Sequence, residues 1–221
     1  LPSGGAEPEP GIRLDGQYPF EEFEKVIFPR AWKNAVQEFQ TDAQGNQLSP
    51  EQTETGEFLT ADAADYTGVT VEPFTVCLSE GEHWLELVEP GQPLVIAEVA
   101  LAAPERADFY VTPEDIRTDV YEPIVIEGED AAVKSNSAMV PKADTNDAGM
   151  SPADAYYTRI NYIGGTSWQS PRETLTWSFR VKTAGYYRLG FRYKQNAVIN
   201  GESWRWLKID GETPFKEAKT L

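Results

Sequence analysis

Cysteine and histidine, which build many metal and redox sites, are almost missing from this chain. Cys77 and His83 are the only examples in 221 residues. One cysteine excludes an intrachain disulfide, a cysteine-based metal centre and a CxxC redox motif. One histidine excludes every site that needs two, and it leaves a Ser-His-Asp triad with weak support. We therefore interpret both residues as structural.

Long apolar runs and basic residues are also scarce. No run approaches the roughly 20 residues of a membrane span, and no basic-then-apolar signal opens the chain. Because the first residue is Leu1 rather than methionine, we expect a mature protein or an excised segment. With 36 acidic against 19 basic residues, the net charge is -17. This charge repels phosphate and anionic lipid, so we predict no nucleic-acid partner. The lack of a long apolar run predicts no membrane span.

The familiar catalytic motifs are absent as well. The sequence has no G-x-S-x-G, P-loop, HExxH or dinucleotide-binding fingerprint. Paired carboxylates could suggest a glycosidase, but chance pairs are common among 36 acidic residues. We predict that the protein is not an enzyme. An acidic surface is compatible with a neutral sugar or a divalent cation, and equally with mere solubility.

What the sequence does have is turn residues at short intervals. Sixteen prolines and seventeen glycines divide the chain into segments of alternating polarity, which is typical of an all-β protein. A turn is predicted at residues 42–46, and a hairpin is predicted around Gly81. The predicted strands include residues 74–78, 84–87, 94–101, 123–130, 175–181, 187–193 and 204–209.

The same signals divide the chain into four parts. Residues 1–11 are rich in proline and glycine and should form a flexible lead-in. Residues 12–103 form a first β region, and residues 123–221 form a second. The acidic, proline-containing segment 104–122 between them is predicted to be a connector.

One short segment occurs twice. Residues 12–22 and 207–217 share Asp, Gly, Pro, Phe and Glu at corresponding positions, and the flanking residues keep their apolar or basic character. Identities in one register at five positions indicate an internal repeat. Each copy is predicted to be a strand that ends in an Asp-Gly turn.

Several motifs together resemble a known family. They are Glu127-Gly-Glu129, Ile163-Gly164-Gly165, Ala184-Gly185-Tyr186-Tyr187, the run from Arg192 to Asn196, and the run from Ile209 to Ala218. This order resembles the galactose-binding-like β-sandwiches of bacterial carbohydrate-binding modules. It is most similar to the tandem sandwiches attached to extracellular solute-binding lipoproteins of sugar ABC transporters.

The resemblance implies a jelly-roll β-sandwich with a non-catalytic role. The expected protein is an extracellular or cell-surface module of a bacterial sugar-uptake protein, which binds carbohydrate and is followed by a solute-binding domain. Two alternatives stay open, because such modules occur on many hosts. The chain could be a structural spacer or protein-interaction module, or an accessory module of a glycoside hydrolase.

The family pattern also implies two half-sandwiches. Residues 12–103 would supply the later strands of one repeat, and residues 123–221 the earlier strands of the next. Either the halves complete each other as one permuted sandwich, or the chain is cut from a longer protein and each half lacks its partner. We favour the permuted sandwich, because unpaired halves would expose long apolar edges.

A calcium site is implied by the resemblance. Glu127 and Glu129 are two residues apart on a predicted strand, so both should face the same side of the sheet. In the family, a glutamate at this position binds a structural calcium ion together with an acidic residue of the last strand, which corresponds to Glu98. Oxygen ligands of this kind suit calcium.

Sugar binding needs an exposed aromatic ring beside groups that bind hydroxyls. Trp168 lies in a glycine-rich loop and is the first candidate for that ring. In contrast, Trp84, Trp177 and Phe191 lie on alternating strands and are predicted to be core residues. The other candidate sugar-binding residues are Tyr156, Asn161, Asn196 and Trp204.

Overall fold

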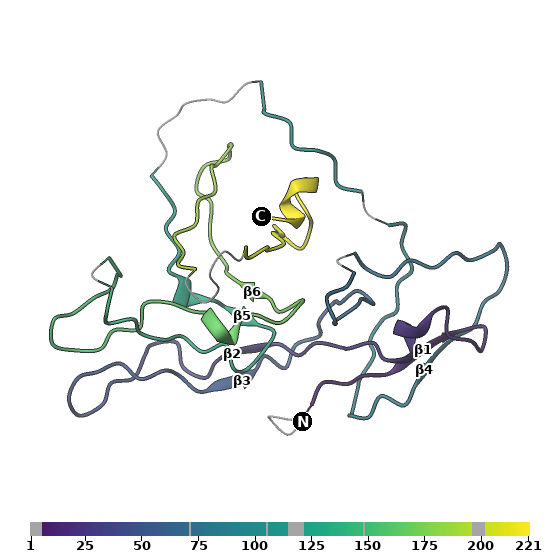
Figure 1. The fold of residues 1–221 in the computed structure, drawn as a ribbon, viewed down its shortest axis with the longest axis horizontal. Helices are drawn as coiled ribbons and strands as arrows, with labels where there is room; N and C mark the ends of the chain where they lie inside the picture. Colours follow the sequence, from purple (N-terminus) through teal and green to yellow (C-terminus); the bar gives the residue numbers. More distant parts are fainter. Residues whose placement is uncertain (1–5, 71, 105, 115–121, 148, 196–201) are drawn as a thin grey trace. The chain divides into compact units, whose positions relative to one another are not determined.

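The computed structural model describes residues 6–70, 72–104, 106–114, 122–147, 149–195 and 202–221. The chain forms two compact units, of which unit 1 combines Leu1–Val99 with Val125–Phe179, and unit 2 combines Ala100–Ile124 with Arg180–Leu221. Short strands and single-turn 3-10 helices are the regular elements of the described residues (Figure 1). The predicted all-β class is therefore confirmed in this coarse form. None of the described helices has the length and apolar character needed to cross a membrane.

The first sheet of unit 1 pairs β1 (Gly11–Leu14) with β4 (Leu85–Val88). The strands are antiparallel, and Arg13 lies opposite Glu86. β1 ends in the predicted Asp-Gly turn, in which Asp15 and Gly16 have φ values of 51° and 78°. Two consecutive residues with positive φ are the signature of a type I′ turn, which Asp-Gly sequences favour.

An apolar cluster packs around this sheet. The 3-10 helix η1 (Glu21–Glu24) follows the turn and buries Phe23, which packs with Ile12 and Val26. The rings of Phe20 and Phe23 meet edge to face with centroids 4.6 Å apart, and the ring of Phe74 lies 5.2 Å from that of Phe23. Such aromatic pairs contribute about 0.5–1.5 kcal/mol beyond simple area burial.

The second sheet has the order β3-β2-β5-β6, with every neighbouring pair antiparallel. β2 and β3 come from the predicted first β region, whereas β5 and β6 come from the predicted second region. The two regions therefore share one sheet. The strands span Gln52–Glu54 (β3), Trp32–Asn34 (β2), Val133–Lys134 (β5) and Leu175–Thr176 (β6).

Lys134 is fully buried in the middle of this sheet. Its Nζ donates hydrogen bonds to Asn34 Oδ1 at 2.6 Å and to Gln52 Oε1 at 2.9 Å. Both acceptors are neutral amide oxygens, so they solvate the amine without neutralising its charge. Burial consequently lowers the pKa of Lys134 from 10.5 to about 8.

Unit 2 contains the second copy of the repeat. Asp210 and Gly211 adopt φ values of 52° and 88°, close to those of the first copy. A 3-10 helix, η4 (Lys216–Lys219), follows at the position that corresponds to η1. Phe20 and Phe215 precede the two helices with nearly the same extended backbone. The predicted repeat is thus a repeat of structure as well as of sequence.

Several strand predictions are wrong. Residues 94–101 and 187–193 form no ladder with other described residues, and residues 84–87 pair with β1 rather than with residues 74–78 across Gly81. Trp84 and Phe191, predicted to be core, are 70% and 64% exposed. Alternating polarity predicts an extended backbone with two different faces. It does not determine which strand pairs with that backbone or which residues bury its apolar face.

A charged bridge supports the β1–β4 pairing. The His83 ring places Nδ1 2.8 Å from Asp15 Oδ2 and Nε2 3.0 Å from the Ser79 carbonyl oxygen. Both partners are acceptors, so the protonated imidazole satisfies both contacts. The hydrogen bond to Asp15 raises the pKa of His83 above 6.5 and lowers the pKa of Asp15 below 3.8.

We expect His83→Gln to destabilise the protein in acid but not in base. Because the pKa of His83 is higher in the folded state, its contribution is present below 6.5 and is lost as the pH rises through the raised value. Urea unfolding of both proteins at about pH 5 and about pH 9 measures the difference. An equal difference at both pH values would contradict this origin.

A second pH effect is expected from Lys134. The folded state releases the lysine proton near pH 8 and the unfolded state near 10.5, so stability should rise with pH across this interval. The gain is up to about 3 kcal/mol. Lys134→Met should remove the rise, whereas Lys33→Met, at an exposed position of neighbouring β2, should keep it. Urea unfolding between about pH 7.5 and 10 tests this, and a rise that persists in Lys134→Met refutes it.

Candidate functional site

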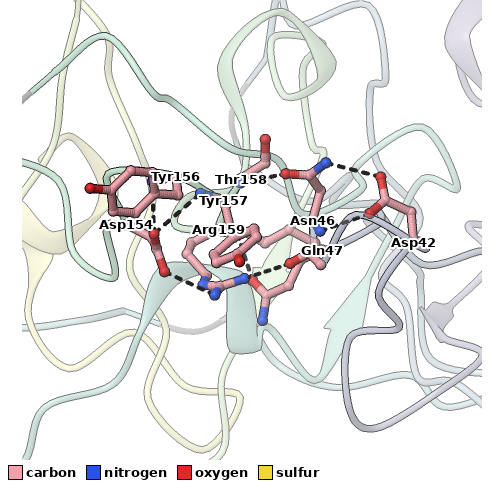
Figure 2. A network of polar contacts seen from close by, with 10 residues as sticks. Asp42, Asn46, Gln47, Asp154, Tyr156, Tyr157, Thr158 and Arg159 are labelled. Atoms are coloured by element: carbon pink, nitrogen blue, oxygen red, sulfur yellow. Dashed lines mark hydrogen bonds and ion pairs between the residues drawn. The ribbon is translucent and has the colours of Figure 1, made fainter.

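A polar network in unit 1 joins the turn at residues 42–47 to the segment 154–161 (Figure 2). Asp42 organises the turn: its Oδ1 accepts hydrogen bonds from the backbone N–H groups of Gln44 and Asn46, and its Oδ2 accepts one from the Asn46 side chain. The Asn46 side-chain bond is the main cause of the lowered pKa of Asp42. Gly45 closes the turn with a φ of 89°. The turn predicted at residues 42–46 is confirmed.

This turn holds the segment that follows residue 156. Asn46 Oδ1 accepts a hydrogen bond from the Thr158 N–H at 2.9 Å, and Gln47 Oε1 accepts one from the Ile160 N–H at 2.8 Å. Gln47 also donates its own N–H to the Thr158 carbonyl. The Ile160 side chain is buried, whereas Tyr157 and the next odd-numbered residues line a cavity.

Arg159 is the centre of the network. Its Nη1 donates to the Gly45 carbonyl at 3.0 Å and its Nη2 to Asp154 Oδ2 at 2.9 Å, while the guanidinium lies over the Tyr157 ring (Figure 2). Asp154 also accepts the backbone N–H groups of Tyr156 and Tyr157. The Tyr156 N–H is the largest cause of the lowered pKa of Asp154, so this carboxylate stays charged.

Asn161 also lines the cavity. Its side chain is buried, and its Nδ2 donates to the carbonyls of Asp144 and Pro152, while its Oδ1 accepts the Asp144 N–H. One amide therefore ties down both ends of the loop between them. The cavity has a volume of about 290 Å³. It is lined by Asp144, Thr145, Asp147, Ala153, Asp154, Ala155, Tyr157, Arg159 and Asn161.

This lining favours a small polar ligand. Carboxylate oxygens, a guanidinium and a tyrosine ring converge on a space near the lower end of the usual ligand-pocket range of ~300–1,000 Å³. Tyr156 adjoins the network, and its side chain is 88% exposed, which leaves the ring free to contact a ligand (Figure 2). Hydroxyl-rich molecules match this combination, because each hydroxyl both donates and accepts a hydrogen bond.

Two of the five predicted sugar-binding residues belong to this site. Asn161 lines the cavity, and Tyr156 lies in the adjoining network. Trp204 lies in unit 2. Asn196 falls outside the described residues. Arg159 was not among the predicted residues, although its position two residues before Asn161 and just after an aspartate-rich stretch was a usable signal.

Trp168 does not line this cavity. Its indole N–H donates to the Glu173 carbonyl at 2.9 Å, and the ring is half-buried. The Glu173 carboxylate accepts the backbone N–H groups of Gln169 and Ser170 and closes the same loop. Trp168 therefore anchors its own loop.

The predicted calcium ligands differ in environment. Glu98 and Glu127 are exposed, whereas Glu129 lies in the 3-10 helix η2 (Gly128–Asp130) and is buried. The prediction of a continuous strand through Glu129 is wrong, and the two neighbouring glutamates do not share one face. Burial raises the pKa of Glu129. Within the described ranges, no three His, Cys, Asp or Glu side chains form a group able to hold a metal ion, so calcium binding stays a prediction.

No family model, curated protein or solved structure matches this chain.

The contact between Asn46 and Thr158 gives a direct test of how the site is held together. Asn46→Ala removes the acceptor of the Thr158 N–H and a donor to Asp42, which should cost about 1–3 kcal/mol. The exposed Asn146 is a matched control, and Asn146→Ala should change stability by less than about 0.5 kcal/mol. Equal effects of the two substitutions in urea unfolding would show that the turn does not hold this segment.

Proposed function

We propose that this chain is a non-catalytic carbohydrate-binding β module, located outside the cell or on its surface. The observation that carries the proposal is the cavity beside Arg159, whose lining combines charged, amide and aromatic groups. The family resemblance supports the same function and adds its context, a sugar-uptake protein of the ABC transporter type with a following solute-binding domain.

The site suits a neutral sugar better than an anion. Asp144, Asp147 and Asp154 line the cavity together with a single arginine, and Arg159 is already paired with Asp154. An anionic ligand would meet this excess of carboxylates, whereas neutral hydroxyls can donate hydrogen bonds to them. Tyr156, at the edge of the network, supplies an exposed ring that can cover an apolar sugar face.

The expected test is loss of sugar binding when the Tyr156 ring is removed. A glycan array identifies the ligand, and calorimetric titration of Tyr156→Ala should then show affinity weaker by about tenfold, since a ring contact contributes on the order of 1 kcal/mol or more. Tyr186→Ala is the matched control, because Tyr186 is also a well-exposed tyrosine but belongs to unit 2.

A second substitution tests the contribution of Arg159 separately from that of the Tyr156 ring. Arg159→Lys keeps the positive charge but cannot contact Gly45 and Asp154 with two nitrogens at once, so it should also weaken the sugar. Absence of binding to any glycan, or equal affinity of wild type and Tyr156→Ala, would refute the proposal.

A further inference from the structure

The two copies of the internal repeat differ in one respect. In the first copy, strand β1 is covered along one edge by β4. In the second copy, residues 206–209 correspond to β1, and among the described residues no strand pairs with them. The β1–β4 pair of the first copy therefore serves as a guide to the strand that could pair with residues 206–209.

One backbone edge, which faces away from β4 in the first copy, is hydrogen-bonded in the same way in both copies. The Val26 N–H donates to the Pro10 carbonyl at 2.9 Å, and at the corresponding positions the Leu221 N–H donates to Arg205 at 2.9 Å. The bond from Leu14 to Gln17 likewise corresponds to the bond from Ile209 to Glu212. On this edge, the second copy thus has the same backbone hydrogen bonds as the copy that pairs with β4.

The other edge, which faces β4 in the first copy, is paired with a described strand only in that copy. There, the Asp15 N–H donates to the Trp84 carbonyl at 2.8 Å, and the Asp15 carboxylate accepts the Trp84 N–H and contacts His83. In the second copy, Trp206, Lys208 and Asp210 occupy the positions of Gly11, Arg13 and Asp15. No backbone hydrogen bond joins the N–H groups of these three residues to another described residue.

The side chains of the second copy suit the same partner. In the first copy, Arg13 lies opposite Glu86, and the apolar Ile12 and Leu14 lie opposite leucines. The second copy repeats this order as apolar, basic, apolar, with Lys208 in the place of Arg13. Ile209 is 45% exposed, so a covering strand would also bury apolar surface.

We propose that residues 206–210 form a docking edge for an extended protein strand of the β4 type. The partner runs antiparallel to residues 206–209, carries an acidic residue opposite Lys208 between two apolar ones, and begins with N–H donors that bind the Asp210 carboxylate. Strand addition of this kind is a general mode of peptide recognition, because an open sheet edge offers unpaired backbone groups. This interaction is independent of the carbohydrate site, which lies in unit 1.

The chain itself supplies the probe. A fluorescein-labelled peptide of residues 79–90 contains the whole β4 strand and its His83 turn. Titration with the full chain should give saturable binding by fluorescence anisotropy. Amide hydrogen exchange, followed by NMR, should become slower at Trp206, Lys208 and Asp210. Protection at residues 11–15 instead would mean exchange with the chain's own β4 and would overturn the proposal, as would absence of binding.

Two N-methylated peptides test the register. In the antiparallel pair, the N–H of Glu86 faces β1, whereas the N–H of Leu87 faces away. Methylation at Glu86 should weaken binding by at least about tenfold, and methylation at Leu87 should leave it unchanged. Equal effects of the two methyl groups would exclude strand pairing in this register.

A charge exchange tests the cross-strand pair. Lys208→Glu in the chain should weaken the native peptide by about three- to tenfold, because two acidic side chains would then lie opposite each other. A peptide with Glu86→Lys should restore the affinity for that variant. If the exchanged peptide does not recover binding, Lys208 does not face this position and the proposed register is wrong.

Discussion

The pairing of segments far apart in the sequence is the constraint on which unit 1 depends. Trp32 of β2 pairs with Lys134 of β5, and Asn46 and Gln47 bind the backbone of Thr158 and Ile160. Residues from both predicted β regions thus form one sheet, and a turn of the first region holds the cavity-lining segment of the second. β5 and β6 each contain only two residues, so they form few backbone hydrogen bonds with their neighbours. Side-chain contacts therefore provide much of the stabilisation that longer strands would provide.

Polar side chains carry much of this association. Buried Lys134 links amides on β2 and β3, and Ser49 donates a hydrogen bond to the Pro141 carbonyl at 2.7 Å. Buried polar groups of this type are costly when a partner is missing. They therefore favour one register over others that would bury the same apolar area. Near the cavity, Asn161 and Gln47 likewise each bind backbone groups.

The two units differ in how far their apolar residues are buried. In unit 1, Ile12, Phe23 and Val26 are buried in a cluster with aromatic neighbours. In unit 2, aromatic residues such as Tyr193 and Phe191 stay exposed, and the strand-like segment at residues 206–209 is bonded on one edge only. An open backbone edge of this kind is a property of surfaces that bind another strand.

Local structure followed from the sequence. The Asp-Gly pairs at residues 15–16 and 210–211 adopt the positive φ values that their residue types favour, and the turn at residues 42–46 forms around Asp42. These features depend on interactions between residues within a few positions of each other. The all-β class followed for the same reason, from the spacing of turn residues. Asn161 and Tyr156 were also found as candidates from their residue types alone.

Only the tertiary structure decided which strands pair and which groups meet. The alternating pattern of residues 84–87 did not reveal that their partner is β1, and the spacing of Glu127 and Glu129 did not reveal the helical turn that buries one of them. The sequence likewise did not reveal that a distant turn places the Gly45 carbonyl beside Arg159. Periodicity records which side chains share a face, whereas partners and burial depend on contacts between residues about a hundred positions apart, which no local pattern contains.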